Sequence, residues 1–157
     1  MNLQALNKPL LLLIMISGIV ISSCKKEKED PEPEPTRKEL LSHAWKVVDV
    51  RQGSETGTSV FNLPFPQVQC LKDNILTLVN DNSFTFDEGV IVCDPPMEAE
   101  GTWSLIESDT KLKLSSPGED DIIITLVSVS EGKFSFEYKI TEGIGEGTYV
   151  VIMQHKS

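Results

Sequence analysis

Alternation of apolar and polar side chains near the C-terminus restricts the fold of this chain more than any other feature. From 133 to 140 every second residue is large and apolar and the residues between are polar: Phe134, Phe136, Tyr138 and Ile140 alternate with Lys133, Ser135, Glu137 and Lys139. Side chains of a β-strand point alternately to its two faces, so the segment predicts a strand with one face on a core and the other in solvent. Such half-buried strands are typical of antiparallel sheets.

The same period of two returns along the rest of the chain. Turn sequences rich in Gly, Asn and Asp separate the alternating segments from one another. The alternating segments predict strands near 45–51, 74–80, 82–87, 101–107, 111–116, 121–130, 132–140 and 146–156. We expect an all-β fold, an up-and-down antiparallel meander of about eight strands. Closure into a barrel would remove the unpaired edges of such a sheet. A two-sheet sandwich is the competing arrangement, because the long connection from Gly53 to Cys70 leaves other topologies open.

One short helix is expected before the first strand. Thr36 and Glu39 have the spacing of a capping box, in which each side chain accepts a hydrogen bond from an unpaired backbone N–H. Leu40, Leu41 and Ala44 follow, so we expect the apolar side of this helix to cover one end of the core.

The N-terminus has the pattern of an export signal. Lys8 precedes an apolar run from Pro9 to Ile21, which at 13 residues is shorter than the roughly 20 needed to span a membrane. The run ends in Ile21-Ser22-Ser23-Cys24, which resembles the lipobox of bacterial lipoproteins. The resemblance implies that residues 1–23 are a lipoprotein signal peptide and that Cys24 carries acyl chains such as palmitate, which anchor the protein to a membrane.

A charged, proline-rich tether is expected at residues 24–37. Lys25 to Pro35 contains charges of both signs, alternating prolines and no large apolar side chain, so it cannot build a core. Within it, Lys28-Glu29-Asp30 resembles the signal that sends some Gram-negative lipoproteins to the outer face of the outer membrane, although solvated linker charge explains it equally well. We expect an outer-membrane protein, and the choice between periplasmic and surface exposure stays open.

The remaining domain, residues 38–157, offers little chemistry. The chain has 14 Lys and Arg against 24 Asp and Glu, a net charge of -10, which argues against nucleic acid as a partner. His43 and His155 have no companion in the spacing of a nucleophilic triad or a metal motif. We therefore expect no enzymatic activity and neither a metal nor a cofactor.

Several features of the domain, taken in order, resemble a known family. They are the short helix before Ala44-Trp45-Lys46-Val47-Val48, the pair Cys70 and Cys93, Leu71-Lys72-Asp73-Asn74, and Gly101-Thr102-Trp103-Ser104-Leu105. Over residues 38–156 they are similar to the lipocalin-like lipoproteins of Gram-negative bacteria. The resemblance implies a small lipocalin-like barrel at the outer membrane, usually without an assigned ligand. Classical lipocalins have Gly-x-Trp near the first strand, whereas no Gly stands two positions before Trp45, so a classical lipocalin ligand is not implied.

Two cysteines remain once Cys24 is lipidated. Exported compartments allow disulfides, so we predict that Cys70 and Cys93 pair. The alternative is a reactive thiol pair, but such pairs usually occur as Cys-x-x-Cys, a motif the chain lacks.

Aromatic side chains at apparent inward positions form the candidate ligand pocket: Trp45, Phe84, Phe86, Trp103, Phe134, Phe136 and Tyr138. Such residues are usually core, and lining a pocket at an open barrel end is their functional alternative. Phe61, Leu63 and Phe65 lie in the long connection and form a candidate lid, with plugging of the barrel as the alternative.

These patterns together predict a membrane-anchored cell-envelope lipoprotein. Its lipocalin-like domain would bind a small apolar ligand or a protein partner without catalysis. The alternative is a structural or accessory envelope subunit with a filled barrel and no ligand. A hollow interior lined by the aromatic residues would favour the first hypothesis.

Overall fold

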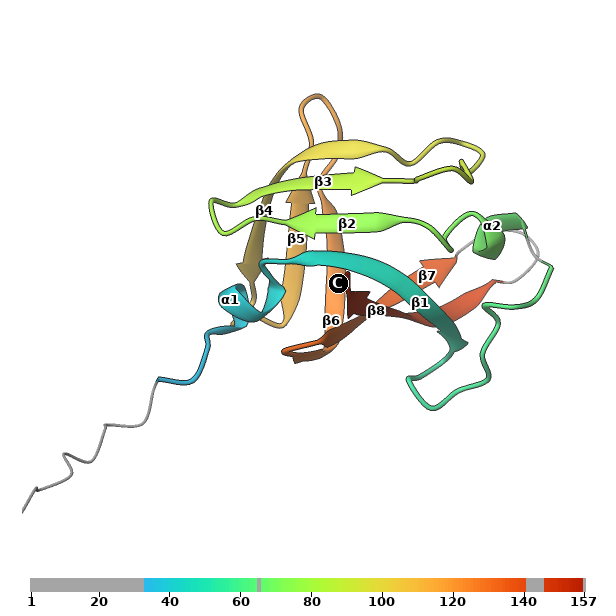
Figure 1. Cartoon of the computed structure of the whole chain (residues 1–157), viewed down its shortest axis with the longest axis horizontal. Coiled ribbons are helices and arrows are strands. Elements are labelled where there is room, and N and C mark those ends of the chain that lie inside the picture. Colours follow the sequence, from blue (N-terminus) through green and yellow to red (C-terminus); the bar gives the residue numbers. More distant parts are fainter. Residues whose placement is uncertain (1–32, 65, 141–145, 157) are drawn as a thin grey trace, which may run out of the picture. The chain divides into compact units, whose positions relative to one another are not determined.

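The eight segments that alternate in sequence all form strands. The computed structural model describes residues 33–64, 66–140 and 146–156. Its strands are β1 (Ala44–Gln52), β2 (Ile75–Leu78), β3 (Ser83–Asp87), β4 (Ala99–Ile106), β5 (Lys111–Ser115), β6 (Ile122–Ser130), β7 (Lys133–Ile140) and β8 (Gly147–His155). Each strand pairs antiparallel with the next, and β8 pairs with β1, which closes the barrel (Figure 1). The expectation of an all-β antiparallel barrel of eight strands is confirmed, and the sandwich is not formed.

Two short helices flank β1. In α1 (Arg37–Leu41) the expected capping box is present: the N–H of Glu39 donates to the Thr36 hydroxyl (3.2 Å), and the N–H of Thr36 donates to the Glu39 carboxylate (2.7 Å). Leu41 is fully buried, so α1 covers one end of the core as expected. The second helix, α2 (Pro66–Gln69), lies in the long connection at the opposite end (Figure 1), and no sequence pattern predicted it.

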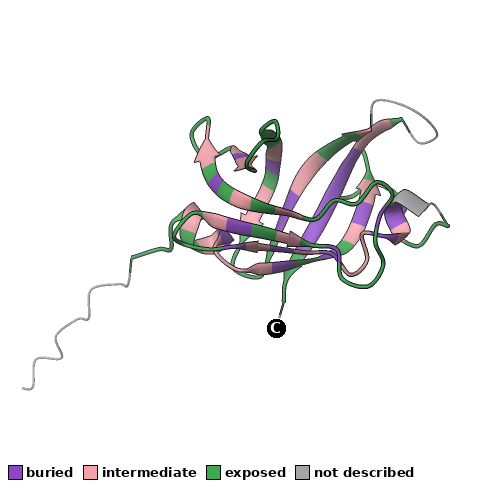
Figure 2. Ribbon diagram, turned by 90° about the horizontal axis from the view of Figure 1, so that it is seen from above, coloured by how far each residue is buried: buried purple, intermediate pink, exposed green. Residues whose placement is uncertain are grey.

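Two irregularities interrupt the period of two. The register shifts between Val47 and Asp49 in β1 and between Leu126 and Ser128 in β6. The extra residues, Val48 and Val127, are 39% and 43% exposed. Buried residues alternate with more exposed ones along β1 and β2, whereas five consecutive residues of β8, 149–153, are buried (Figure 2).

The expectation that Ser135 faces solvent is wrong. Its side chain points away from the barrel interior, yet it is fully buried because the Glu55 carboxylate covers it, accepting a hydrogen bond from its hydroxyl (2.8 Å). Val150 and Ile152 lie on the same outer face of β8 and are also buried. The connection after β1 therefore gives part of this barrel a covered outer surface.

No helix among the described residues is long and apolar enough to cross a membrane.

Candidate functional site

Four of the seven candidate pocket residues belong to the core. Trp45 and Phe134 are completely buried, and Phe84 and Trp103 are 2% exposed. All four belong to one apolar cluster, which fills the half of the barrel beside α1 and continues to Val60 and Val68 in the β1–β2 connection. In this half of the barrel, the usual core role of aromatic side chains holds.

Trp45 is at the centre of the closed half. Its ring meets that of Phe134 edge to face, with centroids 4.9 Å apart, an arrangement that adds to simple apolar burial. Its indole N–H donates to the carbonyl oxygen of Leu41 at 2.8 Å, so the same side chain fixes the last turn of α1 over the core. The indole N–H of Trp103 likewise donates to the carbonyl oxygen of Val79 (2.8 Å).

The remaining three aromatic residues lie toward the other end, where some inward apolar side chains of β6 and β7 are exposed. Along the inward positions of β7, Phe134 is buried, Phe136 is partly buried, Tyr138 is 44% exposed and Ile140, at the strand end, is again partly buried. The neighbouring strand β6 shows a similar difference in the opposite chain direction: Leu126 is 7% exposed and Ile122 is 54% exposed. Phe86, near the end of β3, is also only partly buried. The barrel is therefore filled beside α1, and toward the opposite end, called the open end below, inward apolar side chains of β6 and β7 are exposed while Tyr149 and Val151 of β8 stay buried.

The two described residues of the candidate lid, Phe61 and Leu63, differ in burial. Phe61 packs against the core cluster with the buried Val60, and the Lys72 ammonium lies 5.5 Å from the centre of its ring. Leu63 is 41% exposed, and the Gln69 amide donates to its carbonyl oxygen (2.6 Å), which attaches this stretch to α2. Phe65, like Cys24, lies outside the described residues. Phe61 thus packs against the core, whereas Leu63 is exposed.

The predicted disulfide between Cys70 and Cys93 is confirmed. The two Cα atoms are 5.1 Å apart, and both residues are less than 9% exposed. The bond joins the segment after α2 to the β3–β4 connection, both at the open end of the barrel.

Pairing of β1 with β8 creates a contact that sequence reasoning missed. His43 and His155 lie with ring centroids 4.4 Å apart, and both are within 6 Å of the Trp45 ring. Only closure of the barrel brings together residues from opposite ends of the domain, so spacing along the chain could not reveal the pair. No group of three or more His, Cys, Asp or Glu side chains within the described segments is placed to hold a metal ion.

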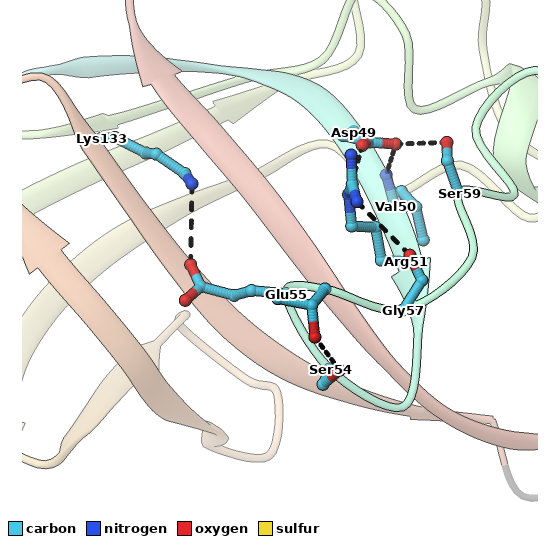
Figure 3. A network of polar contacts seen from close by, with 9 residues as sticks. Asp49, Val50, Arg51, Ser54, Glu55, Gly57, Ser59 and Lys133 are labelled. Atoms are coloured by element: carbon cyan, nitrogen blue, oxygen red, sulfur yellow. Dashed lines mark hydrogen bonds and ion pairs between the residues drawn. The ribbon is translucent and has the colours of Figure 1, made fainter.

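A polar network on the outer surface was also missed. Glu55, in the connection after β1, accepts hydrogen bonds from the hydroxyls of Ser128 and Ser135 (both 2.8 Å). Figure 3 shows its carboxylate directed at the Lys133 ammonium, 3.7 Å away. The same view shows Asp49 paired with Arg51 (2.6 Å) and accepting from the Ser59 hydroxyl. Together these contacts hold residues 53–59 against the barrel.

The Glu55 network predicts a pH-dependent contribution to stability. The two serine hydroxyls, and secondarily Lys133, hold the pKa of Glu55 below its ordinary value of 4.5. A carboxyl group with a lowered pKa in the folded state stabilises the fold above its unfolded pKa, and the contribution is lost as the pH falls through the folded pKa. Glu55→Gln should therefore cost about 1 kcal/mol near neutral pH. The difference should shrink as the pH falls below 4.5 and vanish once the pH is below the lowered pKa of folded Glu55. Urea unfolding of both proteins across this pH range measures the difference in the free energy of unfolding. Glu131→Gln, in the exposed β6–β7 turn, is the control, and a difference that does not change with pH would contradict the prediction.

No protein-family model matches the chain, and no curated protein matches it either.

Proposed function

We propose that this protein is a lipid-anchored, lipocalin-like envelope protein that binds a small apolar ligand at the open end of its barrel and catalyses no reaction. The observation that carries the proposal is the exposure of two inward apolar side chains, Ile122 of β6 (54%) and Tyr138 of β7 (44%). Both residues occupy inward positions of the barrel and leave apolar surface in contact with water. A ligand would remove that surface from water, a gain of about 25 cal/mol per Å².

The filled half limits what the ligand can be. Trp45, Trp103 and Phe134 are buried in the core beside α1, so we expect a ligand to enter only the outer part of the barrel. Its apolar portion would contact Phe86, Phe136 and Ile122, and a polar end would remain in solvent. An acyl chain end or a flat fused-ring molecule has this chemistry.

The anchor part of the proposal rests on the sequence around Cys24. The mature protein should begin at Cys24 and carry several acyl chains, because one chain alone gives only marginal membrane attachment. Mass spectrometry of the full chain extracted from membranes with detergent measures the N-terminal peptide. A peptide that begins before Cys24, or an unmodified Cys24, would contradict the anchor and the outer-membrane location that depends on it.

Ligand binding is tested by the thermal midpoint of the purified full chain with a panel of fatty acids, phospholipids, haem and bile-acid-like molecules. A ligand that binds only the folded state at 100 times its Kd stabilises it by about 2.7 kcal/mol. The chain offers a matched pair of variants: Ile122 and Ile123 are both 54% exposed and lie on opposite faces of β6. Ile122→Ser should weaken binding by about tenfold, and Ile123→Ser should leave it unchanged.

A structural or accessory role is the second candidate, and the filled half of the barrel favours it. It predicts no shift in midpoint with any ligand and no difference between Ile122→Ser and Ile123→Ser. Either result, with folded protein throughout, would overturn the ligand proposal.

A further inference from the structure

We infer that the β3–β4 connection, residues 88–98, docks into a partner protein that presents an apolar pocket bordered by basic side chains. The connection exposes four apolar side chains close together in sequence: Val90 (91% exposed), Val92 (57%), Ile91 (47%) and Met97 (41%). Single exposed apolar residues are ordinary on protein surfaces, whereas a group of them marks an interaction site. This inference does not depend on the ligand proposed for the barrel.

Hydrogen bonds and the disulfide hold the backbone of the connection in place around its exposed residues Val90, Ile91 and Val92. The Asp73 carboxylate accepts hydrogen bonds from the backbone N–H of Val90 (2.7 Å) and of Ile91 (3.1 Å). The disulfide fixes Cys93, whose N–H donates to the fully buried carboxylate of Glu88 (3.0 Å). The apolar side chains therefore project from an ordered support, and binding would not carry the full entropic cost of ordering a loop.

Asn74 also supports the connection, from the segment that precedes β2. Its side chain is fully buried. The side-chain amide nitrogen, placed toward the carbonyl oxygens of Cys70 and Glu88, donates a hydrogen bond to each (2.6 Å and 3.2 Å). Residues 70–74 and 88–93 thus form one structure linked by a covalent bond, carboxylates and a buried amide.

Charge identifies the kind of partner. The sequence from Asp73 to Thr110 contains no Lys, Arg or His, and the exposed carboxylates in and beside the connection are Asp87, Asp94, Glu98 and Glu100. The basic residue nearest in sequence, Lys72, has its ammonium over the Phe61 ring. Basic side chains around an apolar pocket would complement this rim and speed association. A second copy of the chain or an anionic lipid surface would instead meet like charge. The connection also lies at the opposite end of the barrel from α1, where the chain enters the domain (Figure 1).

The first step of the test locates the partner in intact cells. Ile91 of the full chain is replaced by photo-reactive benzoyl-phenylalanine, and Ile123, which is exposed on the outer face of β6, is replaced in the same way as a control. One protein product specific to position 91 is expected. Adducts with lipid only, crosslinks only to a second copy of this chain, the same product from both positions, or no product at all would each overturn the proposal.

The second step measures affinity between the purified full chain and the crosslinked protein. Val90→Ser, Ile91→Ser and Val92→Ser combined should weaken binding more than about tenfold, whereas Ile123→Ser should not change it. Asp94→Asn with Glu98→Gln should weaken binding severalfold at low salt and flatten its salt dependence. An unchanged Kd for the triple variant would overturn the proposal. The thermal midpoint of the triple variant checks its fold, and an unchanged ligand-induced shift separates this site from the barrel.

Discussion

Replacing Trp45 by alanine should lower the free energy of unfolding by about 3–5 kcal/mol, the usual cost of removing a buried Trp. Trp45 is completely buried, packs edge to face on Phe134 and hydrogen-bonds the last turn of α1. The cavity would open between the core and α1, so the helix would lose its main attachment as well. Since small domains are stable by only about 5–15 kcal/mol, this change removes a large part of the total.

Urea unfolding followed by circular dichroism measures the effect of Trp45→Ala. Trp45→Phe is the matched control, because it keeps a ring against Phe134 and loses the N–H donor to the Leu41 carbonyl. We expect it to cost about 1–2 kcal/mol, and it remains measurable if the alanine variant does not fold. A loss below about 1 kcal/mol for Trp45→Ala would show that the packing around α1 contributes little to stability.

Removing the disulfide should cost about 3 kcal/mol. The bond closes a loop between positions 23 apart, and closing a loop of that size restricts the unfolded chain by roughly this amount in the chain-entropy model. The variant is Cys70→Ala with Cys93→Ala. A second effect is expected at the amides of Val90 and Ile91, which should lose protection from hydrogen exchange because the disulfide supports the β3–β4 connection that contains them.

Unfolding of the double alanine variant is compared with that of the oxidised and the reduced protein. Reduction should destabilise the protein with native cysteines and leave the variant unaffected, which separates loss of the bond from loss of packing. Equal stability of the oxidised and reduced forms would contradict the prediction.

Strands were predictable from sequence because their signal is local. The alternation of Phe134, Phe136 and Tyr138 sets the two faces of β7 without knowledge of any partner strand, and the capping box of Thr36 is local for the same reason. The four-residue helix α2 is too short to show a period. Burial of Ser135 was missed because the group that covers it, Glu55, lies 80 positions away in the sequence.

The candidate site was only partly predictable. Phe134 and Tyr138 look equivalent in the sequence because both are aromatic and two-residue spacing places them on one face. One is buried and the other 44% exposed, because they lie at different depths in the barrel, and depth depends on how eight strands are staggered. The apolar tip at Val90 left a visible signal, three consecutive β-branched residues in an acidic connection, but only the structure shows that they are unburied.

If the proposed ligand binds at the open end, the difference in burial along β6 and β7 assigns stability and selectivity to different residues of the same strands. Substitutions near Phe134 should be selected against whatever the protein binds, because they unfold it. Substitutions at Ile122 or Tyr138 remove little buried surface, so they can alter what fits the barrel mouth at small cost to the fold. A barrel built in this way can acquire new binding preferences by mutation at its rim while its closed half stays constant.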